Sequence, residues 1–91
     1  MQKIKELLPI GSVIRLQGAK KSLMVCGVCQ TEQRNQTTYD YIGVLWPEGY
    51  MGDQSQILFN HVDIESVEFT GHTGNERDAF LEKLEAFYAG K

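Results

Sequence analysis

Residues 37–50, with the sequence T-T-Y-D-Y-I-G-V-L-W-P-E-G-Y, decide the fold. β-branched and aromatic residues run from Thr37 to Trp46, and Pro47 and Gly49 then end the run, which is typical of a strand that stops at a turn. The segment holds four of the nine aromatic residues, and large rings supply much of the buried apolar area in a small domain. We therefore expect a central strand that the rest of the chain covers.

Four other segments have the composition of strands, and turn residues or polar residues separate them. They are Ser12–Gln17, Ser22–Gln30, Gln56–Asn60 and Glu65–Thr70, with a turn at Gly18–Lys21 and loops at Thr31–Gln36 and Tyr50–Ser55. Strict alternation in the last strand predicts that Val67 and Phe69 point inward and Glu68 outward. Gly27 inside the second strand indicates a bend or a close approach of backbone.

Helical patterns flank these strands. Ile4, Leu7 and Leu8 have helical spacing, so we expect a short helix over residues 2–8. Residues 60–64 suit a single tight turn that Asn60 caps. The clearest helix spans residues 75–89.

The start of the C-terminal helix offers two possible caps. Thr73 with Glu76 three residues later matches a capping box, and Asn75 with Asp78 competes with it. An apolar stripe follows at helical spacing, formed by Phe80, Leu81, Leu84, Phe87 and Tyr88. The stripe suits packing on the protein's own sheet or against a partner.

A chain of 91 residues supports one hydrophobic core, so we expect a single small β-rich domain over residues 1–91 with its sheet at 12–70. The fold class is mostly β with α. It is a small antiparallel five-stranded curled sheet or SH3-like barrel, with a C-terminal amphipathic helix and a short N-terminal helix. An α+β sheet with the helix packed across one face is the alternative.

The charges are unevenly distributed. Residues 1–30 carry a net charge of +4 and residues 61–91 a net charge of −4, within a total of −3. The two ends either neutralise each other in the fold or orient a protein partner. An acidic chain disfavours nucleic acid as the partner. The apolar runs are shorter than the roughly 18 residues of a membrane span, and we expect a cytoplasmic protein.

The motif Cys26-Gly27-Val28-Cys29 matches the spacing of a redox pair or of half a metal site. Its flanks are strand-like, and residues three apart in a strand lie roughly 10 Å apart on opposite faces. We therefore interpret Cys26 and Cys29 as two buried structural thiols. Redox and metal roles stay open if a bulge at Gly27 changes this geometry.

The chain offers no other constellation for catalysis. His61 is expected in a loop or cap and His72 at an exposed strand end, and the serines lack an acid–base context. We predict no enzyme, no cofactor and no metal. A surface patch is the remaining candidate for function, and the residues that supply it are Tyr39, Tyr41, Trp46, Tyr50 and Met51, unless Trp46 and a tyrosine fill the core.

Four segments resemble a family of small bacterial proteins of unknown function. They are L-P-I-G-S-V-I-R-L (8–16), K-K-S-L-M-V (20–25), Y-D-Y-I-G-V-L-W-P-E-G (39–49) and F-N-H-V-D-I (59–64). Members of that family occur mainly in Gram-positive bacteria and are encoded beside type VII secretion (Esx-like) genes and LXG toxins. The resemblance implies a cytoplasmic accessory factor, and it implies no catalytic residues.

Two hypotheses follow. The first is a non-catalytic protein-interaction module, an adaptor or chaperone that presents a type VII secreted LXG-type toxin to the secretion machinery. The second is an immunity or ligand-binding domain that acts on a toxin or a small molecule. The partner of the first is a secreted toxin or a secretion component, and self-association into a homo-oligomer is left open.

Overall fold

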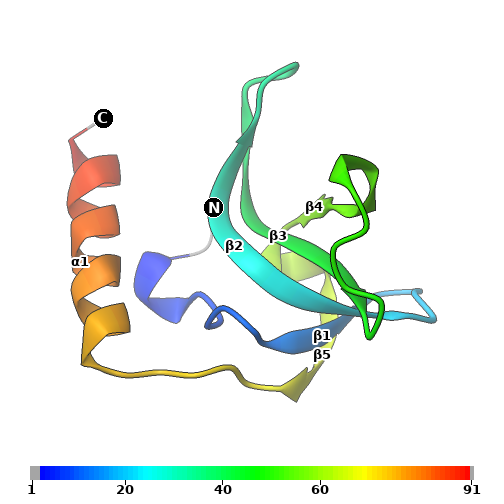
Figure 1. Cartoon of the computed structure of the whole chain (residues 1–91). Coiled ribbons are helices and arrows are strands. Elements are labelled where there is room, and N and C mark those ends of the chain that lie inside the picture. Colours follow the sequence, from blue (N-terminus) through cyan, green and yellow to red (C-terminus); the bar gives the residue numbers. More distant parts are fainter. Residues whose placement is uncertain (1–2, 91) are drawn as a thin grey trace.

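The computed structural model describes residues 3–90 and contains one antiparallel sheet of five strands in the order β4-β3-β2-β1-β5 (Figure 1). The strands are β1 (Val13–Leu16), β2 (Ser22–Glu32), β3 (Thr37–Trp46), β4 (Ile57–Phe59) and β5 (Ile64–Phe69). β3 pairs on both sides, as expected of the organising strand. β4 and β5 remain edges, so the sheet is curled and does not close into a barrel.

The bend of the sheet lies in β2, at a β-bulge. Val25 pairs with Gly43 and Gly27 pairs with Ile42, so Cys26 is an extra residue without a partner on β3. A Cβ atom at Gly27 would lie 2.7 Å from Cγ2 of Ile42, which explains why glycine occupies this position. The expectation of a bend or close approach at Gly27 is confirmed.

The hairpin of β2 and β3 is longer than predicted. Pairing continues to Glu32 and Thr37, so Thr31 and Glu32 belong to β2 and the connecting turn is shorter than the expected loop 31–36. The Thr31 and Thr38 hydroxyls hydrogen bond across the strands at 2.9 Å. In Figure 1 this hairpin extends well beyond the other strands.

Three short 3-10 turns accompany the sheet: η1 (Ile4–Glu6), η2 (Asp53–Ser55) and η3 (His61–Asp63). The predicted helix over 2–8 is wrong in extent, because the chain is extended again at Leu7 (φ −66°, ψ 147°), and Gln2 lies outside the described residues. The predicted turn at 60–64 is confirmed as η3. There the Asp63 carboxylate accepts a hydrogen bond from the Asn60 N–H at 2.9 Å.

The C-terminal helix α1 spans Asn75–Ala89, as predicted. Its cap differs from both proposed versions, because Gly74 is the N-cap residue and no side chain caps the helix. The backbone at Gly74 is fully extended (φ 169°, ψ −179°), which places Thr73 one residue too far from the first turn to cap it. The Thr73–Glu76 capping box is therefore wrong.

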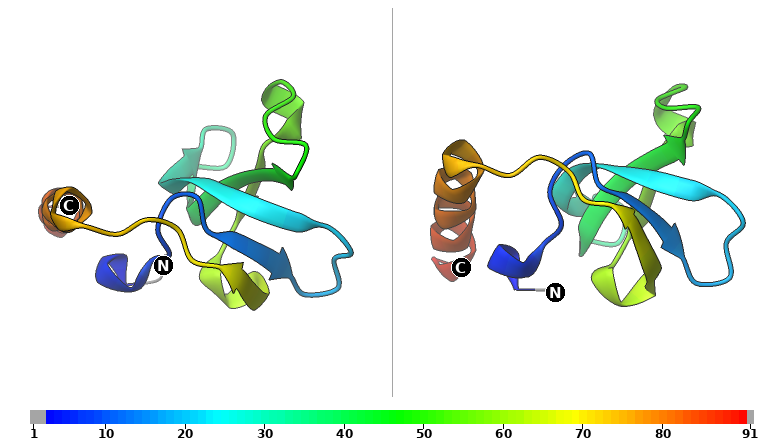
Figure 2. Two further views of the ribbon diagram at one scale, coloured as in Figure 1. Left: turned by 60° about the horizontal axis from the view of Figure 1, so that its bottom comes forward. Right: turned by 90° about the horizontal axis from the view of Figure 1, so that it is seen from below.

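The core lies between the inner face of the sheet and the segment that precedes β1. Its buried residues are Ile4, Leu7, Ile14, Leu23, Val25, Tyr41, Phe59 and Leu81. α1 stands beside η1 rather than across the sheet (Figures 1 and 2), so β5 receives no cover from it. The predicted inward direction of Phe69 is wrong, because Phe69 pairs with Val13, lines a hollow with Val13 and Trp46, and is 61% exposed. Val67 pairs with the buried Ile14 but is itself 46% exposed, so it is not a core residue.

Ion pairs join the two oppositely charged ends of the chain. Lys5 Nζ lies 3.6 Å from Glu85 Oε1, and Arg15 Nη2 lies 3.1 Å from Glu68 Oε2. Both pairs are partly exposed, so each contributes little to stability. The uneven charge distribution therefore partly neutralises itself in the folded chain.

Candidate functional site

The five residues predicted to form an aromatic patch do not share one surface. Tyr41 is completely buried and Tyr39 is partly buried. Trp46 is 51% exposed, and Tyr50 and Met51 in the following loop are 61% and 73% exposed. Tyr41 and Trp46 point to opposite faces of β3, so Tyr41 cannot belong to a surface patch.

Tyr41 instead anchors the core. Its ring stacks on Phe59 with 5.3 Å between centroids, and its hydroxyl oxygen accepts a hydrogen bond from the Leu8 N–H at 2.9 Å. The hydroxyl also lies 2.7 Å from Nδ1 of His61. Desolvation by burial is the main cause of a raised pKa at Tyr41. This residue holds the N-terminal segment on the sheet, and it stays protonated at neutral pH.

The neighbouring Asp40 fixes the turn that carries His61. Its side chain is buried, and Oδ2 accepts a hydrogen bond from the His61 N–H at 2.9 Å. The Asp40 N–H in turn donates to Oδ1 of Asn60 at 3.0 Å. A buried carboxylate is thus used to hold η3 against β3, which is a structural role.

An apolar hollow lies on the outer face of the sheet. Four apolar side chains line it, one each from β1, β2, β3 and the end of β5: Val13, Met24, Trp46 and Phe69. We call the surface of these four residues the Trp46 face. Gly11 and Glu68 complete the lining of the hollow. The hollow has a volume of about 460 Å³. Trp46 belongs to the predicted patch, whereas the sequence analysis missed Val13 and Met24 and assigned Phe69 to the core.

Paired charges border the Trp46 face. The Glu68 carboxylate accepts hydrogen bonds from the Ser22 hydroxyl and from Arg15, which lower the pKa of Glu68. Lys21 Nζ lies 3.0 Å from Glu48 Oε2, and this hydrogen bond lowers the pKa of the Glu48 carboxyl. The border therefore carries both signs of charge around an apolar centre.

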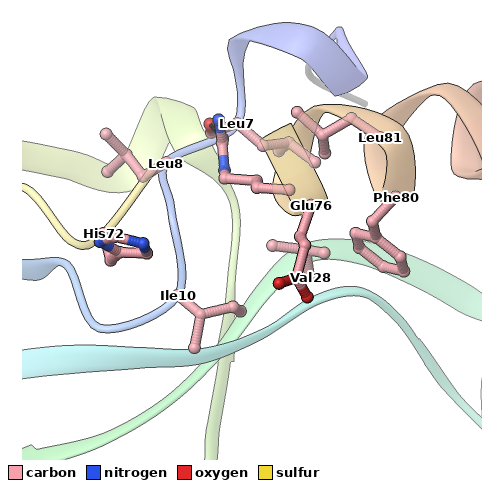
Figure 3. Close-up of a pocket in the computed structure, with 9 residues that line it drawn as sticks. Leu7, Leu8, Ile10, Val28, His72, Glu76, Phe80 and Leu81 are labelled. Carbon is pink, nitrogen blue, oxygen red and sulfur yellow. Dashed lines mark hydrogen bonds between the residues drawn. The ribbon is translucent and has the colours of Figure 1, made fainter. Parts of the chain in front are cut away.

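A second apolar hollow of about 260 Å³ lies between α1, the N-terminal segment and β2 (Figure 3), and we call it the α1 groove. Its apolar walls consist of Leu7, Leu8, Ile10, Val28, Phe80 and Leu81, with His72, Glu76 and Arg77 beside them. The apolar stripe of the helix was the sequence signal for this site. Leu7 and Leu8 also stood out by their helical spacing, but nothing in the sequence indicated that they would lie beside the C-terminal helix.

Residues 7–80 match the family described as Domain of unknown function (DUF4176). The chain belongs to this family. The DUF4176 match spans all five strands and the first turns of α1 as far as Phe80, so it includes nearly all the residues of both hollows. Neither the curated proteins nor the solved structures that were searched gave a match.

The cysteines of this DUF4176 domain differ from the prediction of two buried thiols. Cys26, at the bulge of β2, is exposed, and only Cys29 is partly buried. Both thiols are free, and desolvation is the main cause of a raised pKa at each. A raised pKa lowers the thiolate fraction, which is the opposite of what a reactive redox cysteine requires.

Within residues 3–90, no three histidine, cysteine or acidic side chains gather closely enough to hold a metal ion. His61 lies at the core, and His72 lies at the α1 groove. In the same part of the chain no helix has both the length and the apolar character needed to cross a membrane.

Proposed function

We propose that this DUF4176 domain is a non-catalytic protein-binding adaptor that engages its partner through the Trp46 face. The observation that carries the proposal is the exposure of Trp46 and Phe69 across one hollow that spans four neighbouring strands. Aromatic side chains at the centre of an interface contribute a large share of binding energy, and tryptophan is among the residues most enriched there. Single exposed apolar residues are common, but a contiguous group of this kind is typical of an interaction site.

The border of the Trp46 face supports the same conclusion. Arg15 with Glu68 and Lys21 with Glu48 are already paired before a partner arrives. Binding at the apolar centre therefore leaves these charges compensated, and burial of unpaired charge is a major cost of association. Covering apolar surface contributes about 25 cal/mol per Å² before the costs of association are subtracted.

The proposed partner is a helical segment of a secreted LXG-type toxin. An apolar hollow that crosses several strands suits an amphipathic helix that inserts side chains from one of its faces. We take the toxin as the source of that helix from the family resemblance, which is carried by residues 8–16, 20–25, 39–49 and 59–64. The adaptor would keep the apolar face of the segment covered until it reaches the secretion machinery.

Co-expression tests this proposal. The chain is produced together with the N-terminal region of an LXG-type toxin, and the mixture is separated by size exclusion. We expect co-elution, together with a blue shift in the emission of Trp46, which is the one tryptophan of the chain. Trp46→Ser and Phe69→Ser should each separate the two proteins.

Met51→Ser is the matched control, because Met51 is 73% exposed and does not line the Trp46 face. It should leave co-elution intact. Separate elution of the wild-type proteins, or equal effects of Met51→Ser and Trp46→Ser, would contradict the proposal.

A further inference from the structure

α1 is attached to the domain mainly through the segment that precedes β1. Among residues 75–89 Leu81 alone is buried, and η1 is the element that α1 contacts most. Arg77 donates a hydrogen bond to the Leu7 carbonyl oxygen at 2.7 Å, and Lys5 Nζ lies 3.6 Å from Glu85 Oε1. Both polar partners precede β1, so α1 rests on the N-terminal segment (Figures 1 and 2).

The contacts between α1 and the sheet are weaker. Leu84 and Tyr88 are only partly buried against the core, and the hydrogen bond from the Tyr88 hydroxyl to the Cys29 carbonyl oxygen is long, at 3.4 Å. Departure of α1 would remove one buried side chain, Leu81, from the core. The strands supply five of the eight buried core residues themselves: Ile14, Leu23, Val25, Tyr41 and Phe59.

The N-terminal segment has its own attachment to the sheet. The Leu8 N–H donates to the Tyr41 hydroxyl at 2.9 Å, and the Gly11 N–H donates to the Val25 carbonyl oxygen at 2.8 Å. Neither hydrogen bond involves α1. The segment can therefore keep its place on the sheet when α1 moves away.

The connection between β5 and α1 allows such a movement. The chain is fixed as far as Gly71, whose N–H donates to the Ser12 hydroxyl at 2.9 Å. Residues 72–74 belong to no helix or strand, and all three are exposed. These three residues therefore form the hinge.

The helical structure of α1 depends on its docking. The N-cap residue Gly74 offers no side chain for a capping hydrogen bond, and the last turn carries no basic residue that would favour the helix dipole. A helix of 15 residues is marginal in water on its own. We therefore expect α1 to lose its backbone hydrogen bonds when it leaves the N-terminal segment.

We infer that α1 is a detachable lid over the N-terminal segment, which opens about residues 72–74 while the sheet stays folded. Opening uncovers Ile4 and Leu7, two buried side chains that line hollows together with residues of α1. The movement is separate from the Trp46 face, because α1 contributes no residue to that hollow. The domain thus has a closed form, shown here, and an open form that presents a second apolar surface.

Hydrogen–deuterium exchange of the full chain, read by mass spectrometry of its peptides, tests this inference. In the wild type the amides of α1 should exchange at least about tenfold faster than those in the middle of β2 and β3. Phe59→Leu loosens the core at β4, which lies away from α1 (Figures 1 and 2). It should speed exchange in β2 and β3 about tenfold and that of α1 by less than about twofold, because α1 opens without unfolding the sheet.

A second pair of variants tests the docking contact. Arg77→Ala removes the hydrogen bond to the Leu7 carbonyl oxygen and should speed exchange in α1 roughly 3- to 10-fold. Lys83→Ala is the matched control, because it removes the same charge from an exposed position of the helix. It should change exchange in α1 by less than about twofold.

Equal exchange rates in α1 and the strands, or equal acceleration of both by Phe59→Leu, would overturn the inference. Equal effects of Arg77→Ala and Lys83→Ala would also overturn it, since the contact with Leu7 would then not hold the lid closed. If Phe59→Leu does not fold, the urea dependence of wild-type exchange decides. Exchange in α1 should rise less steeply with urea than exchange in β2 and β3, because opening exposes less surface than unfolding, and equal slopes would contradict a separate lid.

Discussion

The hydroxyl of Tyr41 lies 2.7 Å from Nδ1 of His61 in the interior of the protein. The same oxygen accepts a hydrogen bond from the Leu8 N–H, so the hydroxyl hydrogen of Tyr41 remains available for a hydrogen bond to His61. Donation of that hydrogen to Nδ1 of His61 corresponds to the tautomer in which the ring proton is on Nε2. One side chain thus connects β3, η3 and the segment before β1.

Tyr41→Phe tests this connection. The substitution leaves the Leu8 N–H and Nδ1 of His61 without their partner, and we expect a loss of about 1–3 kcal/mol in the free energy of unfolding. Urea denaturation measures the effect. Tyr39→Phe is the matched control, and because Tyr39 is only partly buried it should cost much less. Equal losses in the two variants would show that the Tyr41 hydroxyl is not a structural link.

A second prediction concerns the pH dependence of Glu68. The Ser22 hydroxyl, and Arg15 beside it, lower the pKa of this carboxyl in the folded protein. Its stabilising effect is therefore present above the pKa of an unfolded glutamate, about 4.3, and is lost as the pH falls through the lower pKa of the folded state. Unfolding curves of the wild type and of Glu68→Gln should differ more at about pH 6 than at about pH 3. A difference that grows on acidification would contradict the assigned hydrogen bonds.

Gly71→Ala should destabilise the fold. A Cβ atom at Gly71 would lie 2.2 Å from the Ile10 carbonyl oxygen and 3.0 Å from the Ser12 nitrogen, so backbone must move. We expect a cost of about 1–3 kcal/mol, measured by thermal or urea unfolding. Gly74→Ala is the control three residues later, where the nearest atom would be a side-chain nitrogen at 3.7 Å. If both variants unfold alike, the close approach of Gly71 to Ile10 is not present in solution.

The two thiols should react separately. Cys26 is exposed and Cys29 is partly buried, so a chromogenic disulfide reagent should label Cys26 first in the native protein. Both reactions should be slower near neutral pH than that of a free cysteine, because the pKa of each thiol is raised. Cys26→Ser should remove the faster phase. An intramolecular disulfide after mild oxidation would contradict this and restore the hypothesis of a redox pair.

Local patterns were sufficient to predict the strands and the C-terminal helix. The alternation and the turn residues placed all five strands within a few residues, and the spacing of Leu81, Leu84 and Tyr88 marked α1 correctly. These features depend on neighbours along the chain, so the sequence displays them directly. The polar residues before β3 led to a predicted end of β2 at Gln30, which is too early because strand pairing continues through Thr31 and Glu32.

The faces of the strands could not be predicted in the same way. β3 is apolar on both sides, with Tyr41 on one and Trp46 on the other, so polarity does not distinguish its inner face. The segment from Ile4 to Leu8, which is distant in the sequence, covers the Tyr41 side of β3 and thereby makes it the inner face. α1 packs beside that segment and leaves Phe69 uncovered, which is why the candidate site contains Phe69 and lacks Tyr41.

The contact between η1 and α1 has a practical consequence for work on this domain. The helix is held largely by residues from the opposite end of the chain, as in the hydrogen bond from Arg77 to the Leu7 carbonyl and the ion pair of Lys5 with Glu85. A shortened chain that starts at β1 would lose the helix's anchorage while keeping the helical sequence intact. Affinity tags and truncations should therefore leave residues 3–8 untouched in any study of α1.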